Sequence, residues 1–150
     1  MNKIKDKKIP IEKTLSRNLK SAYNYMHVEV KKIFKNLEIN VIQFDLMESI
    51  LFSKEKMLSI QELALKTLSV QPNITKNITE LENAGLVERL SVDDRRIAMI
   101  HVTPKGEHLV GEIQKILHEF HLSQYQPLTN EEKYLLDELL KKITPLPDSK

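Results

Sequence analysis

Apolar side chains recur every three or four residues over residues 11–37, near the start of the chain. This spacing predicts one long amphipathic helix with its apolar residues on a single stripe. Such a helix would span roughly 40 Å at a rise of about 1.5 Å per residue. Because this is long for a small domain, we expect the helix to pack against a second subunit as well. The stripe consists of Ile11, Leu15, Leu19, Ala22, Tyr23, Met26, Val30, Ile33 and Leu37.

Two further helices are predicted from capping patterns. Asn40 followed by Gln43 has the spacing of a capping box, with Asn in place of the commoner Ser or Thr, and an apolar helix follows. Ser59 followed by Glu62 has the same spacing and predicts a short helix. The polar residues 53–56 are expected to form the loop between the two.

Another helix is predicted over residues 71–84, after a turn at 68–70. Pro72 stands at its first position, where the missing N–H costs nothing and the fixed φ is already helical. Gln71 takes the cap position, and Gly85 can adopt the left-handed conformation that ends a helix. Its expected buried side consists of Ile74, Ile78 and Leu81.

The spacing then changes from helical to extended. Residues 86–90 and 97–102 are short segments rich in aliphatic and β-branched side chains, and the polar stretch 91–96 separates them. This arrangement predicts a hairpin with 91–96 at its tip. A short helix, a tight turn, a second helix and a hairpin are, in that order, the elements of a winged helix-turn-helix. In that fold the second helix fits the DNA major groove, and the hairpin reaches the flanking groove or phosphates.

Two helices are predicted at the C-terminal end. Thr103 and Pro104 supply a cap and a first-turn proline, and the helical spacing extends to about Ser123. Thr129 opens another capping box, and a leucine-rich stretch follows to Ile143. We therefore predict a mainly α fold: a winged helix-turn-helix with long N- and C-terminal dimerisation helices and a two- to three-stranded wing.

Composition narrows the chemistry that this chain can perform. The sequence has 150 residues and no cysteine, which excludes disulfides, thiolate metal sites, cysteine catalysis and thiol-based redox sensing. We find neither an apolar run of about 18 residues nor a signal peptide, so we expect a cytoplasmic protein without a membrane partner.

Charge is spread unevenly along the chain. The formal net charge is only +2, yet residues 1–35 hold ten Lys or Arg and three Asp or Glu, a local charge of +7. This basic N-terminal segment suits an anionic partner. A solvated helix face with a Lys-rich tail accounts for the same charge equally well.

Several segments, in order and at matching spacing, resemble the MarR family over roughly residues 11–143. The departures are small: Asn40 stands where the family pattern has Thr, and Gln71 and Pro72 stand where small or polar residues are common. The segments that carry the resemblance are 39–40 with 43–44, 60–64, 74–82, 83–89, 94–96 and 102–106.

The resemblance implies a homodimer whose first and last helices interlock and whose two winged heads face DNA. It also implies a repressor that a small molecule or an oxidant releases. On this basis 1–150 is interpreted as one MarR-type domain, with dimerisation helices at 11–37 and 104–143 and a DNA-binding head at 40–103. The expected partner is double-stranded DNA, a pseudopalindromic operator with half-sites roughly 10 bp apart. A winged-helix module that binds protein without DNA is the alternative.

The helix at 71–84 carries the expected base-reading face. Its apolar residues occupy a narrow arc, and uncharged hydrogen-bonding residues with one lysine lie opposite, where they can bond base edges and phosphates. The resemblance adds the hairpin tip, where Asp94 orients Arg96 toward the minor groove; a surface salt bridge is the alternative for this pair. The predicted DNA-binding residues are Gln71, Pro72, Asn73, Thr75, Lys76, Thr79, Arg89, Asp94, Arg95 and Arg96.

A small-molecule effector is expected to enter the cleft between the dimer-forming helices and the head. Tyr23, Met26, His27 and Met47 are the expected lining. The competing interpretation is that aromatic and Met residues on a helix stripe are ordinary core.

No metal, cofactor or enzymatic site is predicted. His118 and His121 are three residues apart, with His108 and Glu112 before them, a spacing that can bind zinc. His108 and His118 nevertheless point to different faces of a helix, so surface or interface histidines are expected instead. The sequence has no Gly-rich phosphate loop and no Ser-His-Asp pattern in a recognisable setting, which argues against an enzyme.

Overall fold

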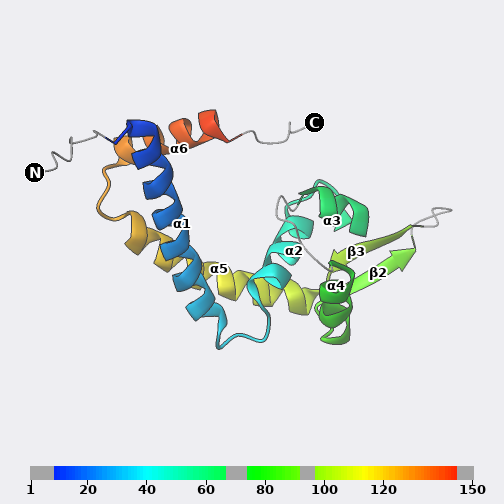
Figure 1. Ribbon diagram of the computed structural model, residues 1–150. Helices are drawn as coiled ribbons and strands as arrows, with labels where there is room; N and C mark the ends of the chain where they lie inside the picture. Colours follow the sequence, from blue (N-terminus) through cyan, green and yellow to red (C-terminus); the bar gives the residue numbers. More distant parts are fainter. Residues whose placement is uncertain (1–8, 67–73, 92–96, 145–150) are drawn as a thin grey trace, which may run out of the picture. The chain divides into compact units, whose positions relative to one another are not determined.

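The computed structural model describes residues 9–66, 74–91 and 97–144. The chain forms two compact units, Met1–Val110 and Gly111–Lys150. Among the described helices none is long and apolar enough to cross a membrane. The elements are α1 (Ile11–Phe34), α2 (Val41–Leu51), β1 (Met57–Leu58), α3 (Ile60–Lys66), α4 (Ile74–Asn83), β2 (Val87–Ser91), β3 (Ala98–Val102), α5 (Pro104–Tyr125) and α6 (Asn130–Ile143) (Figure 1). They confirm the predicted mainly α, winged-helix class.

Helix α2 is the centre of the first unit. It begins at the predicted capping box: Gln43 N–H donates to Asn40 Oδ1 over 2.9 Å, and Asn40 N–H donates to Gln43 Oε1 over 3.0 Å. The helix contacts α1, α3, α4, β1 and β3. Leu46, Met47 and Ile50 are completely buried. A helix enclosed on this many sides must be apolar on most of its surface, which explains why no sharp polar face is visible in its sequence.

Helix α1 ends three residues before the predicted boundary of the 11–37 helix. After Phe34 the last turn tightens, with Leu37 N–H donating to the Phe34 carbonyl over 3.1 Å. The Phe34 ring packs edge-on against Phe44 of α2, with the ring centroids 5.5 Å apart. The chain therefore turns where α1 reaches the core, and Leu37 belongs to the connection.

The wing is a three-stranded antiparallel sheet in the order β1-β3-β2. Val87 pairs with Val102 and Ser91 pairs with Ala98, so the hairpin is in register from end to end. Both hairpin strands begin one residue later than predicted. Strand β1 falls within the predicted two to three strands, but two residues are too few to produce a recognisable alternation.

The second unit contains most of α5 and all of α6. The predicted capping box at Thr129 is confirmed. The Glu132 N–H donates to Thr129 Oγ1 over 3.2 Å, and the Thr129 N–H donates to Glu132 Oε2 over 2.8 Å. Helix α5 extends two residues beyond the predicted end at Ser123. Helix α6 has no buried residue, although it is rich in leucine.

Gly106 allows the start of α5 to approach the segment that follows α4. A Cβ atom at this position would overlap the carbonyl oxygen of Leu86 and lie 2.6 Å from Cγ1 of Val102. Both neighbours belong to the packed base of the wing, where Leu86 is 1% exposed. Only a residue without a side chain fits.

We expect Gly106→Ala to lower the free energy of unfolding by about 1–3 kcal/mol, because the backbone must shift to relieve the overlap. Gly111→Ala is the matched control in the same helix. A Cβ atom there has no described atom within 4 Å, so it should gain up to about 1 kcal/mol of helix propensity. Urea denaturation of both variants checks the prediction, and equal stabilities would contradict it.

Candidate nucleic-acid interface

Helix α4 has one buried side and one solvent-facing side. Ile74, Ile78 and Leu81 are buried as predicted, where the helix contacts α2, α3 and β2. The opposite side carries mainly uncharged hydrogen-bonding groups. The predicted DNA-binding residues on this side, Thr75, Lys76 and Thr79, are all exposed.

The C-terminal end of α4 is fixed by a glycine turn. Gly85 has a φ of 70°, the left-handed conformation predicted for it. Its N–H donates to the Glu82 carbonyl and the Leu86 N–H donates to the Leu81 carbonyl, each over 2.9 Å. These two bonds form a Schellman motif, which satisfies carbonyls that the end of a helix leaves without partners.

The same end is also tied to the start of α5. The buried Thr103 hydroxyl donates to the Gly85 carbonyl over 2.8 Å and accepts from the Gly106 N–H over 3.2 Å. The Lys105 ammonium donates to the Ala84 carbonyl over 2.8 Å, a cation at the negative end of the helix dipole. The direction in which α4 ends is therefore fixed by side chains that follow the wing.

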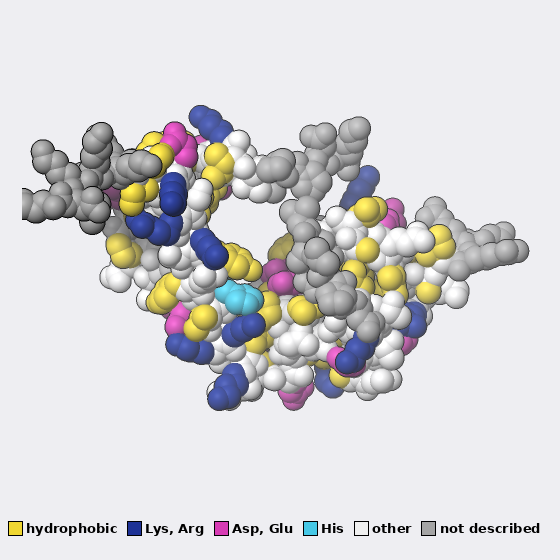
Figure 2. All heavy atoms as spheres, viewed as in Figure 1, with side chains coloured by type: hydrophobic (Ala, Val, Ile, Leu, Met, Phe, Trp, Pro, Cys, Tyr) yellow, Lys and Arg dark blue, Asp and Glu magenta, His cyan; other side chains and the backbone are white. Residues whose placement is uncertain are grey.

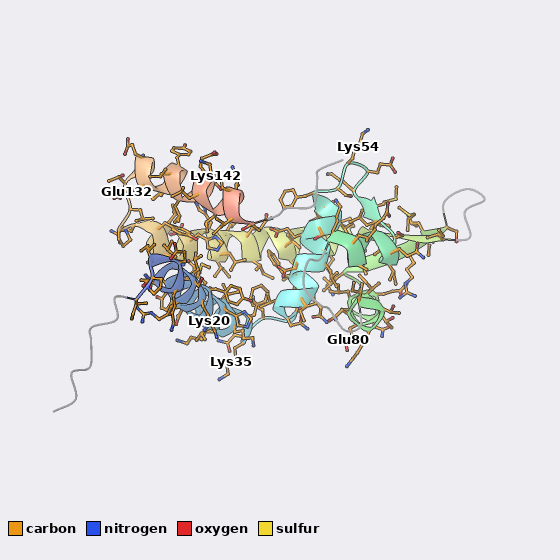
Figure 3. All side chains as sticks on the ribbon, turned by 45° about the horizontal axis from the view of Figure 1, so that its top comes forward. Lys20, Lys35, Lys54, Glu80, Glu132 and Lys142 are labelled. Carbon is orange, nitrogen blue, oxygen red and sulfur yellow. The ribbon has the colours of Figure 1, made fainter. Side chains whose placement is uncertain are left out.

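The middle of α4 is tied to α2. The buried Gln43 side chain donates from Nε2 to Glu80 Oε2 over 2.8 Å. The other carboxylate oxygen, Glu80 Oε1, lies 3.8 Å from Lys76 Nζ. Glu80 therefore links the core helix to the exposed side of α4 (Figure 3).

Arg89 of β2 connects the wing to α4. Its Nη2 donates to Thr79 Oγ1 over 3.1 Å, and its Nε lies 3.5 Å from Glu82 Oε2. Thr79 in turn donates to the Thr75 carbonyl over 2.9 Å. A guanidinium has five N–H donors, so Arg89 can hold α4 and also bond an external acceptor.

Four predicted site residues therefore form one continuous surface on α4 and β2: Thr75, Lys76, Thr79 and Arg89. This surface is not strongly electropositive, because Glu80 and Glu82 lie among its cations. Residues 58–103 as a whole hold five basic and six acidic residues. The remaining predicted residues, Gln71, Pro72, Asn73, Asp94, Arg95 and Arg96, lie outside the described residues.

A groove of about 1120 Å³ runs between α1 and α2. Tyr23 and His27 line it with their rings stacked 5.7 Å apart, and Lys31 and Lys35 follow at the same four-residue spacing. That spacing was visible in the sequence, but only the fold shows that these residues share a groove. The other two predicted lining residues do not border this groove. Met47 is fully buried in the core, and Met26 is half-buried.

Asp45 of α2 also borders this groove. The residue is exposed by surface area, yet surrounding atoms desolvate its carboxyl group, and the nearby Glu48 adds like charge. Desolvation, the larger effect, and the charge of Glu48 together raise the pKa of Asp45 to about 6. The groove thus combines stacked rings, lysines and one carboxyl that titrates near neutral pH.

The histidines that the sequence suggested for zinc line a different groove. His118 and His121 border a groove of about 420 Å³ within the second unit, with Leu122, Leu136 and Leu140. Over residues 9–66, 74–91 and 97–144, no three His, Asp or Glu side chains are grouped to hold a metal ion.

Comparisons with known proteins agree with this architecture. A model of the MarR family matches residues 37–97. The HTH-type transcriptional regulator FarR of Neisseria gonorrhoeae is 32% identical over 100 residues, which cover 66% of this chain and 68% of FarR. A mutant MarR from E. coli in complex with operator DNA is 26% identical with a TM-score of 0.74, covering 88% of this chain and 94% of that one.

A further solved structure is NadR in complex with 4-hydroxyphenylacetate. It is 25% identical to this chain with a TM-score of 0.67, and the match covers 95% of this chain and 98% of NadR. The matched region includes α1 and α2 as well as the winged head. With the short helix α3, the helix α4 and the paired strands of the wing in the expected order, this chain belongs to the MarR family of winged-helix transcriptional regulators.

Proposed function

We propose that this protein is a homodimeric repressor that binds a pseudopalindromic operator and leaves it when an aromatic acid fills the α1–α2 groove. The observation that carries the proposal is the exposed polar side of α4. It is rigidly held by the Gly85 turn, the Gln43–Glu80 bond and Arg89, directly beside the wing. A helix that enters the major groove needs this combination of a fixed position and unburied hydrogen-bonding groups.

In this proposal the side chains of α4 and β2 divide the work. Thr75 and Thr79 face base edges, while Lys76 and Arg89 reach phosphates. The E. coli MarR structure with operator DNA has the same fold and supports a DNA partner. From the sequence we add Gln71, Pro72 and Asn73 at the start of this surface. Asp94, Arg95 and Arg96 are added as the wing tip.

Exposed apolar surface supports the homodimer. On α1, Leu15 is 54% exposed, and on α6 Leu135 and Leu139 are 59% and 48% exposed. Apolar stripes this large are rare on monomeric proteins. A second copy would cover both stripes in a closed, two-fold arrangement.

The groove on α1 and α2 supports an aromatic acid as effector. Stacked Tyr23 and His27 offer a flat apolar contact, and Lys31 and Lys35 offer cations to a carboxylate. NadR, whose structure holds 4-hydroxyphenylacetate, is similar over nearly the whole chain. The relatives are regulators of transcription rather than enzymes, so we propose that the groove binds a signal and not a substrate.

The balanced charge of the head favours one alternative, a winged helix that binds protein. The two functions differ in their dependence on salt. Binding to several phosphates weakens steeply as salt rises, whereas a protein interface with balanced charge does not.

For DNA binding we expect Arg96→Ala to weaken the affinity by roughly 1–3 kcal/mol per contact, twice in a symmetric dimer. Lys76→Ala should weaken it and reduce the salt slope by about 1. Asp94→Ala should have a smaller effect, since it only orients Arg96. The measurement is a titration on an operator selected from random DNA, beside a melting curve.

Lys54→Ala is the matched control for these variants, since Lys54 is an exposed lysine on the turn after α2 (Figure 3). It should keep full affinity. If folded Arg96→Ala also keeps full affinity, the wing does not contact DNA and the protein-binding alternative gains.

For the dimer we expect static light scattering at micromolar concentration to give about twice the chain mass of 17.5 kDa. Leu139→Lys should shift the protein toward monomer, because it places a charge in the apolar stripe of α6. Lys142→Gln on the same helix should leave the mass unchanged. A folded wild-type monomer at this concentration would rule the homodimer out.

For the effector we expect 4-hydroxyphenylacetate or a related aromatic carboxylate to release the operator, more readily as pH falls. Asp45 is ionised above its pKa of about 6 and repels an anion, and it takes up a proton below that pH. Binding should therefore tighten roughly two- to fivefold from pH 7.5 to 5.5, the effect of removing one solvent-screened like charge.

Asp45→Asn isolates this carboxyl from other groups that titrate. The variant should bind the acid more tightly at pH 7.5 and show a flatter pH profile than the wild type. Calorimetric titration at several pH values measures both. Parallel profiles for the two proteins, or release by no aromatic acid, would contradict the proposed effector site.

A further inference from the structure

A row of exposed cations lies on α1, and its last two members, Lys31 and Lys35, border the α1–α2 groove. Taking about 100° per residue, its cations fall within an arc of roughly 60° and extend over about 33 Å. Figure 2 shows dark blue side chains along the length of this helix, and Figure 3 labels Lys20 and Lys35. We call this surface the α1 basic stripe; it consists of Lys13, Arg17, Lys20, Lys31 and Lys35.

The cations of the α1 basic stripe are exposed and form no ion pair among the described residues. The two acidic residues of α1, Glu12 and Glu29, lie outside the arc, and Glu29 pairs with Lys32 at 2.7 Å. Lys31 and Lys35 share the α1–α2 groove with Glu38, Asp45 and Glu80, whereas Lys13, Arg17 and Lys20 lie outside its lining. A row of like charges stores repulsion, which an anionic partner relieves.

The stripe stays accessible in the proposed dimer. Leu15 and Leu19 lie roughly 200° and 240° around the helix from Lys13, so a second copy that covers the apolar side leaves the basic side in solvent. Two copies of the stripe would then be present in each dimer.

We propose that the α1 basic stripe binds the phosphate backbone of duplex DNA outside the segment read by α4. The head itself carries no net positive charge, with five basic and six acidic residues over 58–103, whereas residues 9–35 carry +4, six basic and two acidic residues. The non-specific attraction that brings a regulator to DNA must therefore come from elsewhere, and the stripe holds it. This inference extends the proposed function to a second DNA-contacting surface.

The shape of the stripe favours duplex DNA over other anions. A straight row of flexible cations about 33 Å long matches a rigid rod with closely spaced phosphates. Within the arc Asn24 stands between the cations, and the exposed apolar residues Tyr23 and Val28 lie just outside it, beside Lys31 in the groove. The phosphatidylserine arm of the test below therefore has to exclude a lipid surface. The DNA can be the flank of the operator duplex or a second duplex.

The test compares two triple variants with the wild type. The stripe variant is Lys13→Gln, Arg17→Gln and Lys20→Gln, which leaves the groove residues Lys31 and Lys35 intact. The control variant is Lys54→Gln, Lys115→Gln and Lys142→Gln, which changes the net charge by the same amount at exposed sites elsewhere. Circular dichroism confirms that each variant folds.

Anisotropy titrations use a random-sequence duplex of roughly 30 bp, about three helical turns, over a series of salt concentrations. We expect the stripe variant to lose at least tenfold in affinity at low salt, and the slope of log K against log salt to fall by up to about 2.7. The control variant should match the wild type. Equal losses in both variants, or no loss in the stripe variant, would overturn the proposal.

Three further experiments distinguish this proposal from the proposed operator binding, from the two possible sources of DNA and from binding to a lipid surface. The stripe variant should keep its affinity for a minimal operator. If instead the wild type binds no operator but binds random duplex through the stripe, the proposed function fails and this inference stands. Operators with and without flanks, and bead capture of a second duplex, distinguish the two sources of DNA. Stripe-dependent binding to phosphatidylserine vesicles without stripe-dependent DNA binding would overturn the proposal.

Discussion

The burial of α2 is the constraint on which the first unit depends. Its side chains contact two other helices of the head, α1 and two strands of the sheet, and Leu46, Met47 and Ile50 reach no solvent at all. Each helix that packs on α2 has one apolar side to bury, so α2 decides which side of each remains in solvent. The polar side of α4 faces outward because Ile78 and Leu81 are buried where α4 contacts α2, α3 and β2.

Polar bonds then fix what apolar packing leaves adjustable. Apolar contacts are non-directional, so they set the layer in which α4 lies but not its rotation or where it ends. Those depend on directional bonds: Gln43 with Glu80, Thr103 with Gly85 and Arg89 with Thr79. A side chain that contacts base edges must be held in position before DNA binds, and these three hydrogen bonds hold α4 in a fixed position.

Charge and hydrogen bonding are assigned to different parts of the chain. The head has balanced charge and an exposed side with uncharged donors and acceptors, whereas α1 carries a row of exposed cations that form no ion pair among the described residues. Electrostatic attraction acts at a distance and needs no exact fit, but base contacts need a rigid frame. Separating the two lets each surface meet its own physical requirement.

The sequence by itself determined the elements and their order. Capping boxes at Asn40, Ser59 and Thr129, the helix-ending Gly85 and the change from helical to alternating spacing depend on neighbouring residues only, so they can be read locally. The exposed side of α4 followed from the same helical spacing.

What only the tertiary structure decided depends on residues far apart in the chain. The last residue of α1, Phe34, packs against Phe44 of α2, and Met47 is core because α2 is enclosed. Arg89 spans from the wing to Thr79, and desolvation of the Asp45 carboxyl group, with the nearby Glu48, raises the pKa of Asp45 to about 6. Periodicity reports which residues share a side of one element, but it cannot report which element comes to lie against that side.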